Sequence, residues 1–211
     1  QRSSIVVIGE VVIVSILVVL MVFYLFLFRP RIFDSINNII FIFLMILIMV
    51  GLTSAIIQFS SFSYYVIPFA LLPIVIRVFF DSRTALYAHI ITTLIISLMV
   101  DSPFHFILIQ IIIGMVAVSS LKDMTQRSQL AQTAFIILIS YIFLHVSLEF
   151  ITEGDINRIH WKPIIYFSVS SAILLFAYLL IYIFEKTFGL ISSLTLVELT
   201  NINSDLMLQF A

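Results

Sequence analysis

Seven long apolar runs, separated by short polar stretches, dominate the chain. A helix needs roughly 20 apolar residues to cross the hydrocarbon core of a bilayer, with a range of about 17 to 25. The runs lack the alternation of a membrane β-barrel, and backbone groups in lipid must bond within their own segment, so helices are expected. We predict an all-α integral membrane protein, a seven-transmembrane-helix bundle with spans Ser4–Phe28, Asn38–Phe59, Tyr64–Phe80, Arg83–Val100, Phe104–Leu121, Gln132–Ile151 and Pro163–Phe188.

Prolines mark several features of these spans. Pro103 and Pro163 stand at helix starts, where a missing N–H costs no helical bond. Pro68 and Pro73 bracket one turn of the third span and predict a kink there. The fourth and fifth spans are short, so a re-entrant hairpin is an alternative for this pair.

The basic residues predict the orientation. Cytoplasmic loops of membrane proteins carry an excess of lysine and arginine. With seven crossings, one side holds Arg29, Arg31, Arg77, Arg83, Lys122, Arg127 and Lys186, and the other holds Arg2, Arg158 and Lys162. We therefore predict an N-terminus outside and a C-terminus in the cytoplasm.

Composition supports a lipid environment and excludes some functions. The chain has 211 residues, of which 63% are hydrophobic and only 10% are charged, too much apolar surface for a soluble domain to bury. The formal net charge of -1 offers no basic surface for nucleic acid. Cysteine is absent, so disulfide and thiol chemistry are excluded.

Ionisable residues inside membrane spans are costly, so each of them needs a reason. One set is predicted near the outer surface: Glu10, Asp101, His105, Gln110, His145 and Glu149. His145 and Glu149 are four residues apart and share a helix face. We interpret the set as a candidate polar pocket for an unknown ligand and predict no metal site. The alternatives are a zinc site, or polar helix ends near water with His145 and Glu149 bonded to each other.

A second set, Arg77, Asp81 and Arg83, is predicted at the inner surface. Arg77 and Asp81 have the spacing of an ion pair, either a simple paired arginine or a latch between the third helix and the tail. His89 is interpreted as a hydrogen-bonded core residue, with a pH switch as the alternative. No phosphate loop, nucleophile motif or His-Asp doublet is present, so no catalytic residue is predicted in this chain.

The tail, residues 189–211, reads differently from the membrane spans. Gly189 follows a charged last turn and predicts a helix stop. The polar residues that follow are unsuited to a bilayer core, and Ser204 predicts the N-cap of a new helix. We interpret the tail as a cytoplasmic connector to a further domain, with Gly189, Glu198 and Asn201 as candidate coupling residues.

The tail also carries a resemblance. Its LTLVELTNINSDLMLQFA pattern resembles the junction between the last membrane helix and the HD domain of bacterial seven-transmembrane receptors with an intracellular HD phosphohydrolase domain. The stretches Phe79–Leu86 and Val116–Leu130 are similar to the inner loops of that family. The matching tail residues are Leu196, Glu198, Leu199, Asn201, Asn203, Leu206 and Leu208.

The resemblance implies a domain organisation and a function. Residues 1–188 would be a seven-helix transmembrane domain in the bacterial cytoplasmic (inner) membrane, and residues 189–211 the connector to an HD domain. The whole protein would be a cyclic di-AMP phosphodiesterase with an extracellular sensor domain before Gln1. A divalent metal belongs to the HD domain, and no cofactor is expected in this chain. A homodimer is a further expectation. The alternatives are a transporter or channel domain and a passive membrane anchor and dimerisation module.

Overall fold

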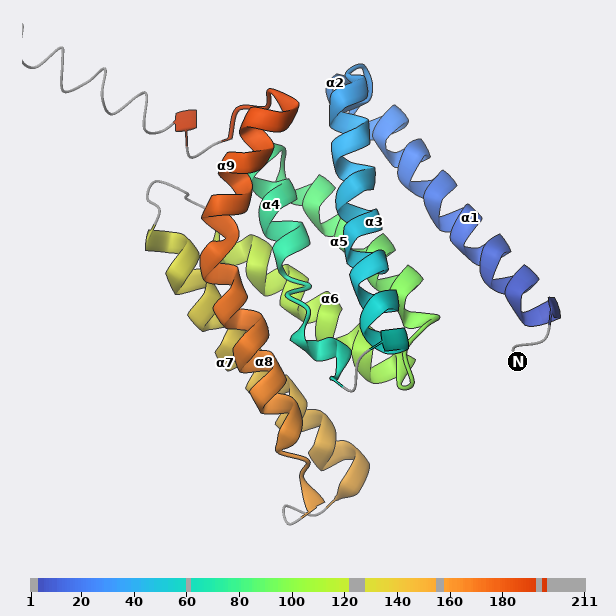
Figure 1. Ribbon diagram of the computed structural model, residues 1–211, viewed down its shortest axis with the longest axis vertical. Coiled ribbons are helices and arrows are strands. Elements are labelled where there is room, and N and C mark those ends of the chain that lie inside the picture. The colour runs from blue at the N-terminus through green and yellow to red at the C-terminus, as the bar shows by residue number, and fades with distance from the viewer. Residues whose placement is uncertain (1–3, 60–61, 122–127, 155–157, 193–194, 197–211) are drawn as a thin grey trace, which may run out of the picture.

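The computed structural model of the protein describes residues 4–59, 62–121, 128–154, 158–192 and 195–196 (Figure 1). Within these ranges every regular element is a helix, as predicted. In chain order the elements are α1 (Ser4–Phe28), α2 (Pro30–Phe33), α3 (Ile36–Phe59), η1 (Tyr64–Val66), α4 (Leu71–Phe79), α5 (Ser82–Ser97), α6 (Pro103–Ser120), α7 (Ser128–Glu153), α8 (Lys162–Ile173), η3 (Leu174–Phe176) and α9 (Ala177–Phe188).

Five helices in the described part of the chain are long and apolar enough to span a membrane. They are α1, α3, α6, most of α7, and the run Lys162–Phe188 that α8, η3 and α9 form together. These helices correspond to the first, second, fifth, sixth and seventh predicted spans. The helices of the third and fourth spans are shorter than predicted, with nine residues in α4 and 16 in α5. Seven full-length spans are therefore not confirmed.

The third predicted span is broken rather than kinked. Pro68 separates η1 from α4, because it has no N–H to continue a helix and it disfavours a helical conformation at Ile67. Ile67 is accordingly extended, with φ -68° and ψ 130°. Pro73 lies in the first turn of α4, where the missing N–H costs no helical bond. The carbonyl of Ile67 accepts a hydrogen bond of 3.1 Å from the Ser170 hydroxyl of α8, so this irregular backbone is tied to a neighbouring helix.

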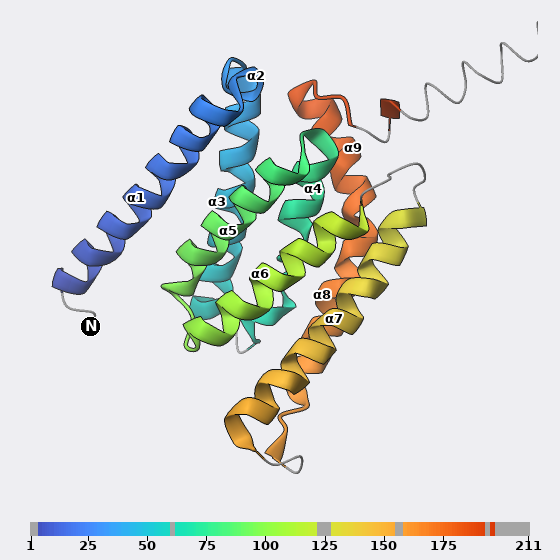
Figure 2. The ribbon, with the colours of Figure 1, turned by 180° about the vertical axis from the view of Figure 1, so that it is seen from behind.

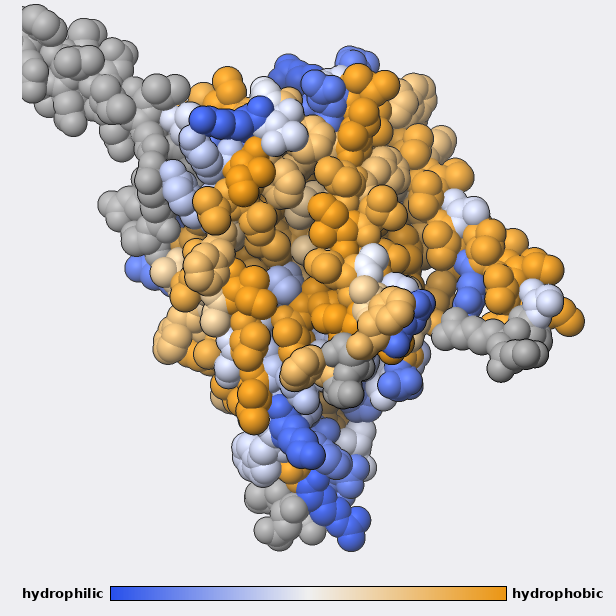
Figure 3. Space-filling model, in the orientation of Figure 1, coloured by the Kyte–Doolittle hydropathy of each residue, from blue (hydrophilic) through white to orange (hydrophobic). Residues whose placement is uncertain are grey.

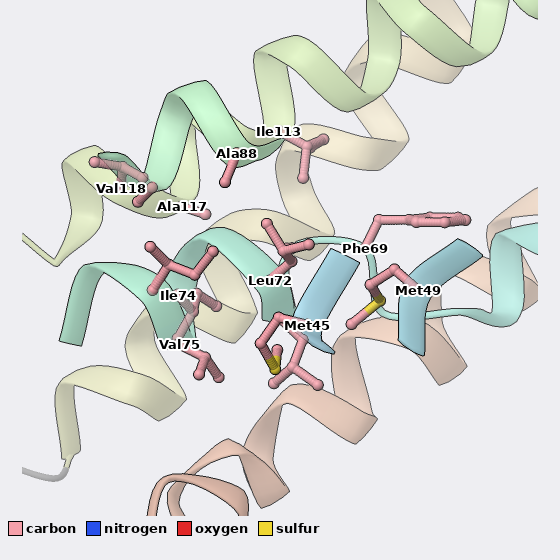
Figure 4. Packing of buried hydrophobic residues seen from close by; sticks show 14 of the residues in the cluster. Met45, Met49, Phe69, Leu72, Ile74, Val75, Ala88, Ile113, Ala117 and Val118 are labelled. Atoms are coloured by element: carbon pink, nitrogen blue, oxygen red, sulfur yellow. The ribbon is translucent and has the colours of Figure 1, made fainter. Parts of the chain in front are cut away.

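The core is built around α4. Seven of its nine residues are buried, as expected for a helix in which every residue except Arg77 is apolar. It packs against α3, α5, α6 and α9, and α5 beside it buries ten of its 16 residues. Figure 4 shows the α4 side chains lying between methionines of α3 on one side and small or branched residues of α5 and α6 on the other. The labelled residues are Met45, Met49, Phe69, Leu72, Ile74, Val75, Ala88, Ile113, Ala117 and Val118.

Helix α1 is attached to the bundle through its C-terminal half. Its buried residues are Leu17, Met21 and Leu25, and Tyr24 stacks on Tyr87 of α5 with ring centroids 4.0 Å apart. Figures 1 and 2 both show the N-terminal half diverging from the other helices. The position of α1 therefore depends on a small number of contacts near residue 25.

The surface separates into apolar sides and hydrophilic ends. Figure 3 shows apolar residues over most of the visible side, with hydrophilic residues where α7 connects to α8 and, at the opposite end, near α2 and the end of α9. Large apolar side chains such as Ile5, Phe143 and Ile151 are more than 70% exposed, which indicates lipid as their solvent. Figure 1 shows the end of α9 at the same end of the molecule as α2, and the start of α1 away from that end. Which end faces the cytoplasm stays a prediction.

Candidate functional site

A polar pocket lies at the end of the bundle where α7 connects to α8. Its cavity volume is about 300 Å³, and it is bordered by η1, the start of α6, the end of α7 and the start of α8. Its polar and aromatic lining residues are Tyr64, Tyr65, Ser102, His105, His145, Glu149, Thr152, Glu153 and His160. We call this cavity the His160 pocket.

His160 organises the wall of the pocket that α7 forms. Its backbone N–H donates to Oε2 of Glu149 at 3.1 Å, and its Nδ1 lies 3.0 Å from the same oxygen. The carbonyl of His160 in turn lies 2.8 Å from Nε2 of His145. His145 and Glu149 therefore each bond to His160 rather than to each other. The four-residue spacing placed both side chains on one helix face, but the partner comes from the following loop.

The structure brings together half of the predicted outer set. His105, His145 and Glu149 line the His160 pocket. Asp101 lies in the turn before α6, exposed and outside the lining. Glu10 lies on α1, whose main contacts are with α2 and α5, and it does not line the pocket. Gln110 is buried in the interior. Among the residues that the structure describes, no group of three or more His, Asp or Glu could hold a metal ion.

A chain of buried polar contacts joins α5, α6 and α7 in the interior. Nε2 of His89 lies 2.7 Å from the backbone carbonyl of Gln110, so His89 is the hydrogen-bonded core residue that the sequence suggested. The Gln110 side chain accepts a hydrogen bond of 3.0 Å from the Tyr141 hydroxyl. The Tyr141 ring stacks on Phe167 of α8, with centroids 4.7 Å apart, and Phe167 also contacts the ring of His145. These contacts extend from α5 to the wall of the His160 pocket.

Glycine at position 114 makes the His89 contact possible. A Cβ built on Gly114 would lie 2.2 Å from Cδ2 and 2.6 Å from Nε2 of His89. On an α-helix, a side chain covers the turn that precedes its own residue. A side chain at position 114 would therefore cover the backbone carbonyl of Gln110. The absence of a side chain at Gly114 therefore leaves that carbonyl open to the imidazole.

An ion pair at the opposite end corrects the predicted inner set. Nε and Nη2 of Arg29 donate to the two carboxylate oxygens of Asp81 at 2.9 and 3.0 Å. Asp81 also caps α5, because its carboxylate accepts from the backbone N–H groups of Arg83 and Thr84. The predicted pairing of Asp81 with Arg77 is wrong: Nε of Arg77 is buried without a hydrogen-bond partner in the described structure. Arg83 bonds to Asp81 through its backbone N–H group and not through its guanidinium group.

The ionisation of this pair follows from its hydrogen bonds. Partial burial acts to raise the pKa of the Asp81 carboxyl, but hydrogen bonds from Arg29 and Thr84 outweigh burial and hold its pKa below the usual value. The hydrogen bond to Asp81 raises the pKa of Arg29. Both groups are therefore charged at neutral pH, and the pair joins the end of α1 to the start of α5.

The segment predicted to be the connector begins at the same end of the bundle. Helix α9 ends at Phe188, and Gly189 adopts the left-handed conformation with φ 64°, which confirms the predicted helix stop. Oε1 of Glu185 accepts from the Ser192 N–H at 2.9 Å and from the Thr195 hydroxyl at 2.7 Å. Glu185 therefore ties the first part of the connector to α9. The other candidate coupling residues, Glu198 and Asn201, lie outside the described residues, as does the helix predicted after Ser204.

Sequence reasoning missed three partners that the structure identifies. His160 lies in the polar stretch between the sixth and seventh predicted spans, Arg29 directly after the first span, and Glu185 in the charged last turn before Gly189. Only Glu185 had a local signal, since a carboxylate one turn before Gly189 and followed by serines and threonines has nearby donors to accept from. Arg29 pairs with a residue 52 positions away, a separation that periodicity does not encode.

Comparison with known proteins identifies the family. The model of the family described as 7TM receptor with intracellular HD hydrolase matches residues 4–192. The chain belongs to this family. No curated protein and no solved structure matches the chain. The 7TM receptor part is the membrane part of such proteins. None of the four histidines of this chain is followed by aspartate, so the His-Asp motif of the HD hydrolase is not in it.

Proposed function

We propose that residues 1–188 are a membrane-embedded sensory and transducing domain and that residues 189–211 connect it to a cytoplasmic HD phosphohydrolase. The substrate of that hydrolase is a cyclic dinucleotide, cyclic di-AMP, and its divalent metal is held by the HD domain. The observation that carries this proposal is the family match over residues 4–192. A bacterial cytoplasmic membrane and an extracellular sensor domain before Gln1 belong to the same proposal. The homodimer stays a prediction.

The geometry supports a route for the signal. The helical run Lys162–Phe188 begins beside the His160 pocket and ends at Gly189. Its middle contains the 3₁₀ turn η3, and a 3₁₀ stretch inside a longer helix often marks a hinge. A displacement of the α8 end at the pocket is transmitted along this run to the connector, and Glu185 couples the connector to α9.

A transporter or channel is less well supported. Such a function needs polar groups along a path through the bilayer. A path would have to use the predicted outer polar residues, but Glu10 and Asp101 of that set do not line the His160 pocket. His89 and Tyr141, which lie in the interior, are buried and engaged with Gln110. A passive anchor and dimerisation module would need neither the pocket nor the Glu185 contacts.

Removal of the Glu185 carboxylate tests the transducing function. We expect Glu185→Ala, in the protein that carries both the membrane and HD domains, to change the basal rate of cyclic di-AMP hydrolysis at least about threefold. The reason is that two hydrogen bonds at about 1 kcal/mol each no longer hold the connector against α9. Hydrolysis is measured in nanodiscs with purified protein. Glu185→Gln, which keeps an Oε1 acceptor, is the matched control and should resemble the wild type.

Equal hydrolysis rates for Glu185→Ala, Glu185→Gln and the wild type would argue for a passive anchor. A protein without cyclic di-AMP hydrolysis, but with activity on another phosphorylated substrate, would contradict the substrate assignment. Ion or solute flux through liposomes containing the membrane domain would support the transporter instead.

Cysteine labelling tests the orientation. The chain has no cysteine, so single cysteines give unambiguous labels. Lys162 and Lys186 are exposed at opposite ends of one helical run. We expect a membrane-impermeant maleimide to label Lys162→Cys in intact cells and Lys186→Cys only after the cells are permeabilised. The reverse pattern would place the connector outside the cell and contradict the proposal.

A further inference from the structure

The His160 pocket has an excess of negative charge. Glu149 and Glu153 line it, and none of its lining residues in the described structure is lysine or arginine. The nearby cations Arg158 and Lys162 are exposed and lie outside the lining. The two glutamates contribute a formal charge of -2 to the lining of the pocket. A positively charged ligand is therefore favoured over an anion.

Glu149 retains one carboxylate oxygen for a ligand. Both contacts from His160 go to Oε2 of Glu149, and no hydrogen bond to Oε1 is present among the described residues. The Glu149 side chain is only 16% exposed. A carboxylate oxygen with little access to water forms stronger contacts with a cation than one at an open surface. His160 fixes the orientation of this carboxylate through two contacts.

Two tyrosines supply an aromatic wall. Tyr64 and Tyr65 both line the pocket, with ring centroids 4.6 Å apart. Tyr65 is held in place because it also packs against Phe106 and Phe167. Aromatic faces attract organic ammonium ions, and this attraction strengthens where water is excluded. Carboxylates beside aromatic rings are suited to an ammonium ion whose nitrogen carries carbon substituents.

The helix starts that border the pocket are poorly built for an anion. Free N–H groups at a helix N-terminus can bind anions. Helix α6 begins with Pro103 and α8 with Lys162 followed by Pro163, so each first turn lacks one of those N–H groups.

We propose that the His160 pocket binds a small organic ammonium ion. The charged nitrogen lies near Oε1 of Glu149, and the carbon substituents contact Tyr64 and Tyr65. The volume of about 300 Å³ is ample for an ion of a few carbon atoms. The binding itself is independent of the hydrolase, although its role as a signal rests on the proposed function.

Equilibrium binding of choline tests this assignment. Radiolabelled choline is titrated against the whole protein in nanodiscs, and the neutral isostere 3,3-dimethyl-1-butanol is added as a competitor. We expect saturable choline binding that excess isostere does not displace, because the two molecules differ in charge and hardly in shape. Because no hydrolysis is measured, failure here is distinguishable from failure of the Glu185 test.

Substitutions locate the site. We expect Glu149→Gln to weaken choline binding about tenfold or more, the loss typical of one charge-assisted contact, and Glu153→Gln about two- to threefold. Glu10→Gln removes a carboxylate from α1, away from the pocket, and should leave the affinity unchanged. Glu149→Gln keeps an acceptor for His160, and thermal unfolding within a few degrees of the wild type verifies its fold.

Three outcomes overturn the assignment. The first is the absence of saturable choline binding. The second is equal competition by 3,3-dimethyl-1-butanol, which would show a site for apolar shape rather than charge. The third is choline binding that Glu149→Gln and Glu153→Gln leave unchanged, which would place the cation elsewhere in the protein.

Discussion

Replacement of Gly114 by alanine is expected to destabilise the bundle by about 2–4 kcal/mol. The added Cβ would lie 2.2 Å from Cδ2 of His89, and the imidazole is 2% exposed, so it has no open space to enter. Overpacking costs about 1–3 kcal/mol, and displacement of the ring also loses its hydrogen bond to the Gln110 carbonyl, about 1 kcal/mol. Thermal unfolding in detergent, followed by size-exclusion chromatography, measures the change.

Gly51→Ala provides the matched control. Gly51 also lies inside a long apolar helix, but a Cβ at that position meets nothing within 4 Å. This variant should be neutral or more stable by up to about 1 kcal/mol, the difference in helix propensity. In a His89→Ala background the added cost of Gly114→Ala should fall to nearly zero, because the clashing ring is gone. Equal stability of Gly114→Ala and Gly51→Ala in the wild-type background would contradict the packing that the structure shows.

The hydrophobic pattern predicted the helical class and the positions of the helices, because a helix in lipid is specified by its own apolar length. The pattern failed where packing against neighbouring helices determines the backbone conformation. The third span was predicted as one kinked helix, but its centre is enclosed by α3, α5 and α6. Protein rather than lipid surrounds the break at Pro68, and Ser170 bonds the carbonyl of Ile67. Irregular backbone is tolerated at such a place, and hydropathy does not reveal it.

The sequence predicted a polar pocket, but it predicted only some of the residues that line it. Spacing on one helix correctly put His145 and Glu149 on a shared face. Spacing could not exclude Glu10, because the divergence of α1 from the pocket is set by packing between helices. It also assigned Asp81 to Arg77, the basic residue at helical spacing. The actual partner, Arg29, approaches because Tyr24 and Tyr87 stack and bring the end of α1 to the start of α5.

Asp81→Ala is expected to lower the stability by about 1–2 kcal/mol and to loosen α1. The substitution removes an N-cap, worth about 1 kcal/mol, and an ion pair whose side chains are 23% and 38% exposed, which solvent screening limits to about 1 kcal/mol or less. Asp81→Asn keeps a good cap but loses the charge, so it should cost about half as much. Thermal unfolding measures both variants.

The pH dependence of stability separates the charge from the cap. The pKa of Asp81 is depressed in the folded protein, so the stability it contributes is fully present above the unfolded pKa of about 3.9. It is lost as the pH falls through the lower folded pKa. The difference in stability between the wild type and Asp81→Asn should therefore be constant from about pH 5 to 8 and shrink below about pH 4. A difference that grew below pH 4 would contradict the sign of the shift. Equal stability of Asp81→Asn and Asp81→Ala would show that the ion pair, not the cap, accounts for the effect.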